Sequence, residues 1–417
     1  MKVVFLNRFF FPDHAATSQL LSDLAFDLAD RGYDVHVITS RQRYDDASAR
    51  LPAESVVKSV RIHRVWTSQF GRGHLPGRVI DYLTFYLTTA RGLWRLIGKG
   101  DVVVAKTDPP LISVVAGWVA DCRGAMVVNW LQDLFPEVAI ELNVRFLPGW
   151  MGKILEWLRN RSLHGARMNV VLGRLMSDRL AALNVDRDRM RIIHNWADGR
   201  AIVPIPPDDN PLRKEWGLEG RFVVGYSGNL GRAHEFSTLL EAMERLKEDD
   251  RIVFLLIGGG PRLARVKLES ARRGLTNVLF KPYQPRELLC LSLGVPDLHV
   301  VVLQPRLEGL IVPSKFYGIA AAGRPTLLIG AKDGEIARIL NETEAGFVFP
   351  VGAGEALAEK VAELSSDPAR CLRLGRNART VFEQRFDCDL ALRAWRDLLS
   401  GLADTASVAV ASGRDGA

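Results

Sequence analysis

The chain has 417 residues, of which 47% are hydrophobic and 25% charged, and a formal net charge of +7. This length exceeds what one compact core supports, so two domains are expected, and the composition is that of a soluble globular protein. The positive charge favours an anionic partner. The four cysteines lack Cys-x-x-Cys spacing, which argues against a zinc site and for reduced thiols in the cytoplasm.

The first half alternates apolar runs with helical patterns. Residues 3–6 and 102–104 are continuous apolar runs, and residues 126–130 are apolar except for Asn129. Such segments are typical of strands buried in a parallel sheet. Residues 20–28 have the apolar spacing of an amphipathic helix. We therefore predict a doubly wound α/β domain, in which ligands bind past the carboxyl ends of the strands. His14 in the first loop then faces substrate on the acceptor side, although a solvated histidine is the favoured alternative.

Two stretches in this half, residues 75–99 and 150–163, combine aromatic with basic side chains. In the second stretch the apolar residues share one helical face, while Arg159 and its basic neighbours lie mostly off that face. Such helices rest on anionic bilayers, with aromatic rings at headgroup depth. The alternative is that both are ordinary amphipathic helices packed on the sheet. Because the basic and aromatic residues coincide, contact with an anionic membrane surface is slightly favoured.

Residues 196–211 are rich in Pro, Asp and Gly, which marks a linker. Strand and helix patterns restart after it, with apolar runs at 222–226, 252–257 and 298–303. We therefore expect domains at 1–195 and 196–385. An amphipathic helix at 386–403 is expected to return to the first domain, followed by a disordered tail at 404–417.

The stretch 306–325 follows the last of these apolar runs. It holds Glu308, then Ser314 as a predicted helix cap, and Lys315 in the first helical turn. A lysine beside a helix start suits a phosphate, and the carboxylate suits hydroxyl groups, so the stretch fits a nucleotide-diphosphate-sugar. A strand-loop-helix corner with an incidental salt bridge remains an equal alternative.

Motifs spread along the chain resemble the retaining glycosyltransferases of family 4, in the branch that builds colanic acid and O-antigen. The resemblance is carried by residues 7–12, 132–137, 194–196, 226–234, 257–261 and 312–315, in the order of the family. It implies the GT-B fold, with two Rossmann-like doubly wound domains facing a cleft. The C-terminal domain of such enzymes binds the nucleotide-sugar, and the N-terminal domain binds the acceptor.

The resemblance also implies roles for particular residues. Arg232 and Lys315 are the expected diphosphate cations, and Glu308 is the expected contact of the donor sugar. Asp133 is expected to orient the acceptor hydroxyl, with a structural role equally open, and Gln132 lies on the acceptor side. The remaining donor-site residues are Gly228, Asn229, Gly231, Gly258, Gly259, Gly260, Lys281, Tyr283 and Ser314.

Three features depart from the family pattern. Gly318 stands where the second acid, usually a ribose contact, is expected. Ala15 and Ala16 replace the glycine pair of the first loop, and Gln132 replaces a histidine. These departures leave the donor contacts open while the predicted fold stands.

We therefore expect a metal-independent transferase without a cofactor, acting on a lipid-diphosphate-linked acceptor at the inner face of the cell membrane. Asp387 and Asp389 form a single Asp-x-Asp, which we interpret as a helix cap and not a metal site. A nucleotide-sugar epimerase of GT-B fold and a non-catalytic nucleotide-sugar-binding subunit are the alternatives. Nucleic-acid binding is a poor fit, because the basic residues form no reading motif.

Overall fold

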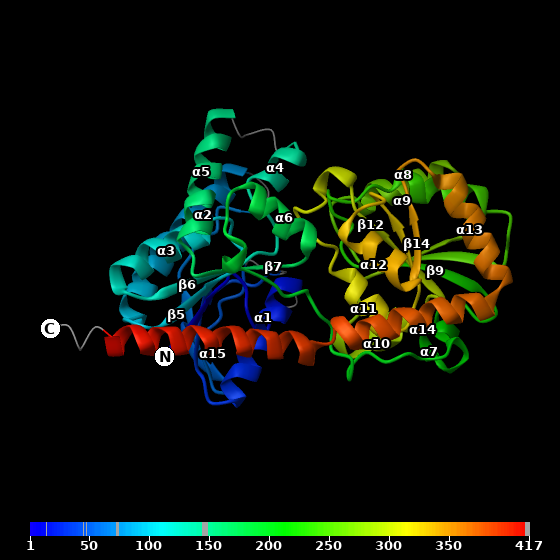
Figure 1. The fold of residues 1–417 in the computed structure, drawn as a ribbon. Helices are drawn as coiled ribbons and strands as arrows, with labels where there is room; N and C mark the ends of the chain where they lie inside the picture. The colour runs from blue at the N-terminus through cyan, green and yellow to red at the C-terminus, as the bar shows by residue number, and fades with distance from the viewer. Residues whose placement is uncertain (14, 45, 47, 72–74, 144–148, 413–417) are drawn as a thin grey trace. The chain divides into compact units, whose positions relative to one another are not determined.

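The computed structural model describes the chain except residues 14, 45, 47, 72–74, 144–148 and 413–417 (Figure 1). The chain divides into two compact units, one formed by Met1–His194 with Leu392–Ala417 and the other by Asn195–Ala391. Each unit has its own parallel sheet with helices packed on it (Figure 1). The prediction of two Rossmann-like doubly wound domains is therefore confirmed.

The N-terminal unit has an eight-stranded sheet among its described residues, in the order β3-β4-β2-β1-β5-β6-β7-β8. Every pair is parallel except β3 with β4, which form a hairpin that was not predicted. The strands are β1 Lys2–Leu6, β2 Asp34–Ser40, β3 Glu54–Val57, β4 Val60–Val65, β5 Val102–Ala105, β6 Met126–Trp130, β7 Met168–Val171 and β8 Met190–Ile192. The α-helices of this unit are α1 Ala16–Asp30, α2 Leu75–Leu96, α3 Ile112–Arg123, α4 Glu137–Glu141, α5 Gly149–Gly165 and α6 Arg174–Ala182.

The register of the central strands determines which loops meet at the ligand-binding edge. Leu6 of β1 pairs with Ala105 of β5, and Ala105 pairs in turn with Asn129 of β6. The loops that leave β1, β5 and β6 therefore emerge side by side at the carboxyl edge of the sheet.

The C-terminal unit has a six-stranded parallel sheet among its described residues, in the order β11-β10-β9-β12-β13-β14. Its apolar core lies between the sheet and the helices α8, α9 and α13. The strands are β9 Phe222–Ser227, β10 Ile252–Ile257, β11 Val278–Lys281, β12 Leu298–Val302, β13 Thr326–Ile329 and β14 Gly346–Phe349. The α-helices are α7 Pro211–Glu215, α8 Ser237–Arg245, α9 Leu263–Arg272, α10 Leu289–Gly294, α11 Lys315–Ala321, α12 Glu335–Thr343, α13 Gly354–Ser366 and α14 Pro368–Arg385.

The last helix, α15 Cys388–Ser412, belongs to the N-terminal unit from Leu392 onward. Asp387 caps it, because its carboxylate accepts a 3.0 Å hydrogen bond from the backbone N–H of Asp389, as interpreted from the sequence. Trp395 of α15 packs against Trp130 at the end of β6, with ring centroids 4.7 Å apart. The helix continues to Ser412, whereas disorder was predicted from residue 404.

Candidate functional site

In the C-terminal unit, the loop after β9 and the loop after β10 are joined by their backbones. Gly228 N donates to Ile257 O at 2.8 Å, and Leu230 N donates to Gly259 O at 2.7 Å. The predicted glycine-rich donor segments, which lie some thirty residues apart in the sequence, therefore form one continuous backbone surface.

Glycine is required where the two loops meet. Gly258 has φ +137°, and a Cβ on it would lie 2.2 Å from the carbonyl oxygen of Gly228. Gly260 has φ +124°, and its Cβ would lie 2.2 Å from Oδ1 of Asn229. Both conformations are strained for other residues, and neither position has room for a side chain.

Lys315 is the first residue of α11, and its ammonium group lies against this backbone surface. Its Nζ donates to the hydroxyl of Tyr226 and, at 3.0 Å, to the carbonyl of Asn229. The same Nζ lies 3.8 Å from the ring centroid of Tyr226. Burial lowers the pKa of Lys315 to about 7, because the charged amine has lost much of its hydration. A bound anion would restore the charged form.

His234 supports this arrangement, a role that was not predicted although the residue was part of the quoted motif. Its Nδ1 accepts a 3.2 Å hydrogen bond from Gly231 N and lies 3.0 Å from the hydroxyl of Tyr226. Burial, followed by the charges of Lys315 and Arg262, lowers the pKa of His234 to about 3. The imidazole is therefore neutral at physiological pH, and it helps to fix Tyr226 beneath the lysine.

Arg232, the second predicted cation, lies in the same loop with its side chain exposed. Its backbone carbonyl accepts a 2.7 Å hydrogen bond from the side-chain amide of Gln304, which holds the loop in place. Within the described part of the chain, the guanidinium of Arg232 forms no hydrogen bond or ion pair with protein groups. The side chain is therefore available to an anionic ligand.

Of the predicted donor-site residues Lys281 and Tyr283, only the second places its side chain against the glycine loops. The ring of Tyr283 lies against Gly259, where a Cβ would be 3.0 Å from Cε2 of the ring. Lys281 contacts the glycine loops through its backbone carbonyl, which accepts a 2.9 Å hydrogen bond from Gly258 N. Its ammonium group lies instead over the ring of Trp216, 5.0 Å from the centroid.

The predicted cap of α11 is wrong. Ser314 occupies the N-cap position, but its side chain makes no capping hydrogen bond. Its own backbone is helical, with φ −64° and ψ −19°, whereas a capping side chain needs an extended backbone at this position. Ser314 is exposed beside Lys315.

Two further positions of the 306–325 stretch have clear surroundings. The Glu308 carboxylate accepts a 3.2 Å hydrogen bond from Glu335 N, the first residue of α12. It thereby interacts with the positive end of that helix. Gly318 faces the core, since a Cβ on it would lie 3.2 Å from the side chain of Leu293 in α10. An acid at this position would meet an apolar side chain.

In the N-terminal unit, Gln132 and Asp133 follow β6 at the carboxyl edge of the sheet. Asp133 Oδ1 and Gln132 Nε2 are buried without a hydrogen-bond partner among the described residues. Burial raises the pKa of Asp133 to about 6, opposed by a hydrogen bond from Thr107 and assisted by Asp108. His14, the other predicted acceptor-side residue, lies outside the described residues.

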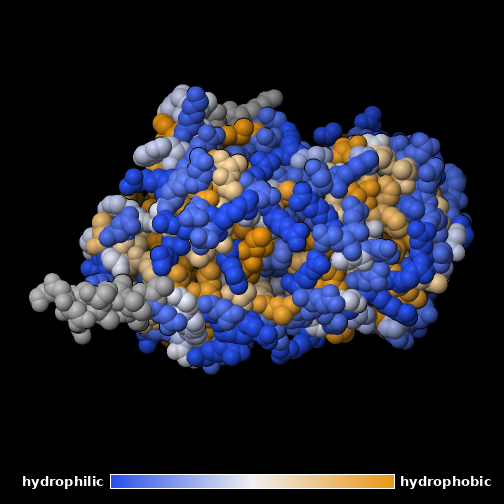
Figure 2. Space-filling model, in the orientation of Figure 1, coloured by the Kyte–Doolittle hydropathy of each residue, from blue (hydrophilic) through white to orange (hydrophobic). Residues whose placement is uncertain are grey.

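Helices α2 and α5, which contain the two predicted basic and aromatic stretches, expose apolar side chains, and so does the neighbouring helix α3. Leu87 of α2 is 72% exposed, Trp118 of α3 is 61% exposed, and Trp150 and Trp157 of α5 are 64% and 60% exposed. Helix α3 packs between α2 and α5, so these residues belong to one side of the unit. In Figure 2, hydrophobic residues reach the surface among hydrophilic ones over α3 and α5.

Arg159 of α5, which the sequence places mostly off the apolar face of the helix, is nevertheless buried. Its guanidinium is buried and forms a bidentate ion pair with Glu137, in which Nη1 lies 2.9 Å from Oε2. Of the two carboxylates that follow β6, Asp133 and Glu137, the second is therefore engaged in an ion pair. The exposed side of α5 is instead formed by tryptophans and by Lys153 and Arg161.

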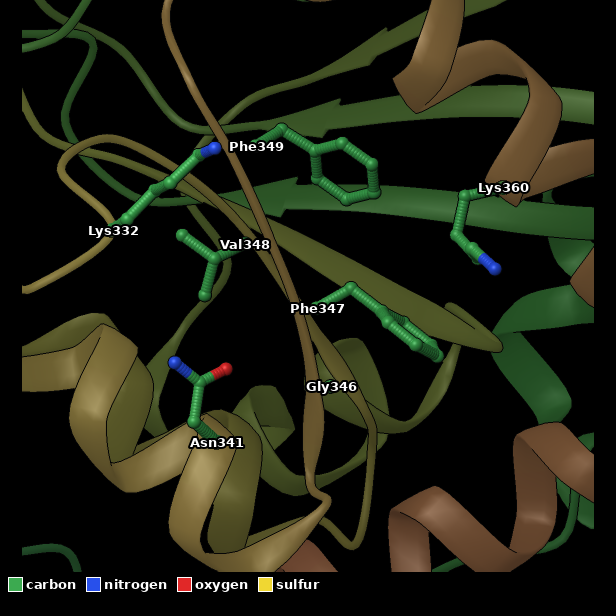
Figure 3. Close-up of a pocket in the computed structure, with 7 residues that line it drawn as sticks. All are labelled: Lys332, Asn341, Gly346, Phe347, Val348, Phe349 and Lys360. Carbon is green, nitrogen blue, oxygen red and sulfur yellow. The ribbon is translucent and has the colours of Figure 1, made fainter.

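A separate hollow of about 300 Å³ lies against the edge strand β14, with Phe347, Phe349 and Lys360 on one side of the strand and Val348, Lys332 and Asn341 on the other (Figure 3). None of the residues predicted to bind the donor lines it.

Among the residues that the structure describes, no three His, Cys, Asp or Glu side chains are grouped as metal ligands would be. In the same residues, no helix is long and apolar enough to span a bilayer.

Two family profiles match the two halves of the chain. The profile described as "Glycosyl transferase 4-like domain" matches residues 17–196, and that described as "Glycosyl transferases group 1" matches residues 208–381. The first contains Gln132 and Asp133, and the second contains every predicted donor-site residue.

Full-length relatives agree with these profiles. The probable glycosyltransferase WbjE of Pseudomonas aeruginosa is 28% identical over 308 residues, which cover 72% of this chain and 76% of that protein. The putative colanic acid biosynthesis glycosyl transferase WcaI of Escherichia coli K12 is 22% identical over 337 residues, covering 78% and 82%. The solved structure of Anabaena Alr3699/HepE, in complex with UDP and glucose, matches 96% of this chain and 100% of that chain with TM-score 0.71 and 18% identity.

Proposed function

Because the chain belongs to family 4 of the glycosyltransferases, with the GT-B fold and relatives of the surface-polysaccharide type, we propose that it transfers a sugar from a nucleotide-diphosphate-sugar to an acceptor hydroxyl with retention of configuration. The acceptor is a lipid-diphosphate-linked sugar, and the protein works in the cytoplasm on the inner face of the cell membrane. The observation that carries the proposal is the ammonium group of Lys315 held against the joined glycine loops.

The loops and Lys315 suit a diphosphate because of what each provides. The missing side chains at Gly258 and Gly260 let a ligand approach the backbone closely. Lys315 has an ammonium group that is poorly hydrated, so binding an anion there costs little further desolvation. The solved HepE complex contains UDP, which is consistent with a nucleotide donor for this fold.

Charge stabilisation is the main catalytic task in this reaction. When the sugar departs, negative charge develops on the leaving diphosphate, and preorganised cations stabilise the charge where it appears. In our proposal Lys315 and Arg232 provide this stabilisation, so that no metal ion is needed. Glu308 accepts hydrogen bonds from donor-sugar hydroxyls, and Asp133 orients the attacking hydroxyl for approach on the face from which the diphosphate leaves.

Ribose recognition must differ from the family pattern. Gly318 replaces the usual acid and faces Leu293, so this face of α11 offers no carboxylate to a ribose. We propose that specificity for the base and ribose comes from the segment of Tyr283, whose ring already packs on Gly259.

A donor panel tests the proposal. Thermal unfolding is measured with UDP-, GDP- and dTDP-sugars, since a ligand that binds the folded state stabilises it by mass action. We expect one base series to raise Tm, and turnover with a lipid-linked acceptor to release the matching nucleoside diphosphate. Conversion of the sugar without any acceptor would favour an epimerase, and donor binding without hydrolysis or transfer would favour a binding subunit.

The exposed tryptophans support the membrane part of the proposal. Trp118 and Trp157, with Leu87, present apolar surface beside exposed basic residues such as Arg91 and Lys153. Aromatic and basic side chains together suit the headgroup region of an anionic bilayer. A lipid-linked acceptor would be reached from such a surface.

Vesicle sedimentation tests this part. We expect binding to phosphatidylglycerol vesicles that weakens with salt and is absent with phosphatidylcholine. Trp157→Gln should reduce binding several-fold, while Leu268→Gln on α9 should not, although both side chains are 60% exposed. Equal binding of the two variants would refute the proposed face.

A further inference from the structure

Several polar atoms that lack hydrogen-bond partners among the described residues lie in the N-terminal unit, near the ends of β5 and β6. Ala105 and Asn129 are paired at the ends of these strands, so Asp108 and Gln132 lie the same distance past the sheet. The backbone carbonyl of Asp108 accepts a 2.7 Å hydrogen bond from Arg8 N, which brings in the end of β1 as well. Three neighbouring strands therefore contribute to one place at the carboxyl edge.

Polar groups at this place lack protein partners. Asp133 Oδ1, Gln132 Nε2 and Arg8 Nε are all buried, and none has a hydrogen-bond partner among the described residues. In the same residues, the carboxyl group of Asp108 makes no hydrogen bond or ion pair and interacts with its neighbours only through their charge. Buried polar atoms without partners are rare in folded proteins, and they commonly indicate a ligand or water.

Nearby groups that are already satisfied show the contrast. Asp13 accepts from Ala15 N at 3.0 Å and also from Tyr44 N. Lys106 donates through Nζ to the carbonyl of Thr17 at 2.7 Å. Satisfied groups thus lie directly beside the unsatisfied atoms of Asp133, Gln132 and Arg8.

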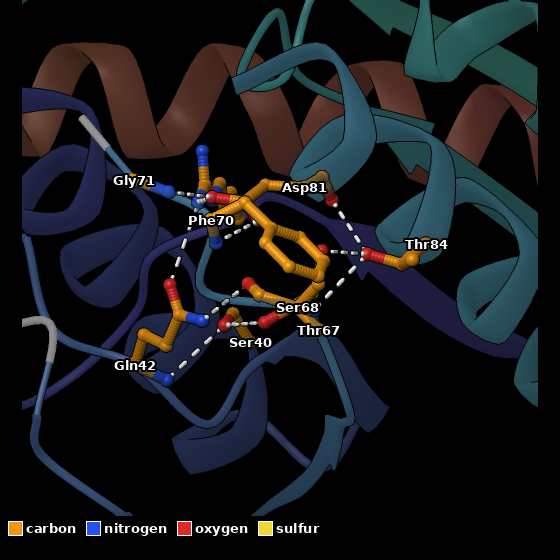
Figure 4. A network of polar contacts seen from close by, with 9 residues as sticks. Ser40, Gln42, Thr67, Ser68, Phe70, Gly71, Asp81 and Thr84 are labelled. Atoms are coloured by element: carbon orange, nitrogen blue, oxygen red, sulfur yellow. Dashed lines mark hydrogen bonds and ion pairs between the residues drawn. The ribbon is translucent and has the colours of Figure 1, made fainter. Parts of the chain in front are cut away.

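Arg8 is held rigidly at this place. Its Nη2 lies 3.9 Å from the carboxylate of Asp81 and donates to Gln42 at 3.4 Å, within a polar network that also includes Ser68 (Figure 4). The guanidinium stacks on Tyr82, 5.2 Å from the ring centroid. The Asp81 network thereby fixes Arg8 while leaving its Nε without a partner.

The unsatisfied donors and acceptors at this place indicate which functional groups a ligand must have. Carboxyl groups of Asp108 and Asp133 need donors, whereas Gln132 Nε2 and Arg8 Nε need acceptors. A hydroxyl group both donates and accepts, and so a polyol satisfies all of them. A phosphate accepts only, and the two aspartates would repel it.

We propose that Asp108, together with Asp133 and Gln132, binds the ring hydroxyls of the acceptor sugar, with Asp108 as a direct substrate contact. The inference rests on the proposed transferase function and specifies which chemical part of the acceptor the N-terminal unit holds. The diphosphate of the acceptor lies outside this site.

The pKa of Asp108 allows an experiment to distinguish a substrate-binding role of this residue from a structural role. Burial raises the pKa of Asp108 to about 6, opposed by Arg8, Lys106 and Arg78 and assisted by Asp13. Asp133, Tyr82 and Tyr86 also face the group. A raised carboxyl pKa means that ionising Asp108 destabilises the fold as pH rises through about 4 to 6. Removing its charge should therefore leave the protein as stable or more stable at pH 7.5.

The experiment measures sugar binding and stability in the same variants. Saturation-transfer NMR is recorded at pH 7.5 with the methyl glycosides of glucose, galactose, mannose and N-acetylglucosamine, on wild type, Asp108→Asn and Asp81→Asn. Wild type should show transfer to at least one glycoside. Asp108→Asn should lower that signal at least five-fold while its Tm stays equal to or above that of wild type, because hydrogen bonds to a carboxylate are stronger than those to an amide.

Asp81→Asn is the matched control for a structural carboxylate. Asp81 accepts from Ser68 Oγ at 2.7 Å and from Phe70 N at 3.0 Å, so this variant should lower Tm. The inference is overturned if no glycoside binds wild type, if Asp108→Asn keeps the full signal, or if it lowers Tm as Asp81→Asn does. Donor binding in the nucleotide-sugar panel is independent of these outcomes, so a failure there would refute the proposed function instead.

Discussion

Replacing Lys315 by Met should stabilise the protein without donor at low pH and abolish the response to donor. Burial moves the pKa of the lysine from 10.5 to about 7. At about 1.4 kcal/mol per pKa unit, the charged side chain costs at most about 5 kcal/mol at pH 6, and about 2 kcal/mol at pH 9, where the folded state holds it neutral. Met has a similar length and no charge.

The hydrogen bonds of Lys315 oppose this gain. Its Nζ donates to Tyr226 and Asn229 and lies over the Tyr226 ring. Two hydrogen bonds at roughly 1 kcal/mol each and a cation–π contact of about 1 kcal/mol are lost in the variant. The net effect is a gain of about 2 kcal/mol at pH 6 that falls to about zero at pH 9, where the neutral amine forms no cation–π contact.

Urea unfolding of wild type and Lys315→Met at pH 6 and pH 9, with and without the nucleotide identified by the donor panel, measures both effects. The sign follows because a lowered lysine pKa makes the unfolded state bind more protons between pH 7 and 10.5, so that wild type gains stability as pH rises. A variant less stable than wild type at pH 6, or a difference that is the same at both pH values, would refute the reasoning. Donor stabilisation retained in the variant would show that Lys315 is not the phosphate ligand.

Three further outcomes are expected. Arg232→Ala should lose about 2–4 kcal/mol of transition-state stabilisation, read from kcat/KM, with an unchanged Tm, whereas Arg272→Ala on α9 should leave both unchanged. Gly258→Ala should lower the stability of the C-terminal unit by more than about 2 kcal/mol, because the added Cβ would clash with the Gly228 carbonyl. The control Gly217→Ala should cost about 1 kcal/mol, since Gly217 has φ +68° but no atom within 4 Å of an added Cβ. Equal melting temperatures of the two variants would contradict the close contact between the two loops. Glu308→Gln should lower kcat with a stability loss of about 0.5–1 kcal/mol from the weaker interaction with the α12 N-terminus, and an unchanged kcat would remove Glu308 from the sugar site.

Local patterns predicted much of the framework. The apolar runs of β6 and β10 were placed at their observed bounds, because strands buried on both faces have continuous apolar sequence. The β3–β4 hairpin was missed, since β3 is short and half-exposed, and its turn uses Lys58 and Ser59 at positive φ without glycine. The Ser314 cap failed because residue type alone does not determine whether the N-cap backbone is extended.

The sequence by itself determined that this protein has two Rossmann-like domains, because apolar periodicity and glycine-rich turns are local properties, and it indicated the residues that we propose for the donor site. Only the tertiary structure decided how those residues act on one another. It brought Lys315 onto the carbonyl of Asn229 and turned Gly318 towards Leu293. It also left the Asp108 carboxyl group and Oδ1 of Asp133 without a hydrogen-bond partner among the described residues, at one edge of a sheet. Burial and hydrogen-bond satisfaction depend on segments distant in sequence, so neither can be derived from a local pattern.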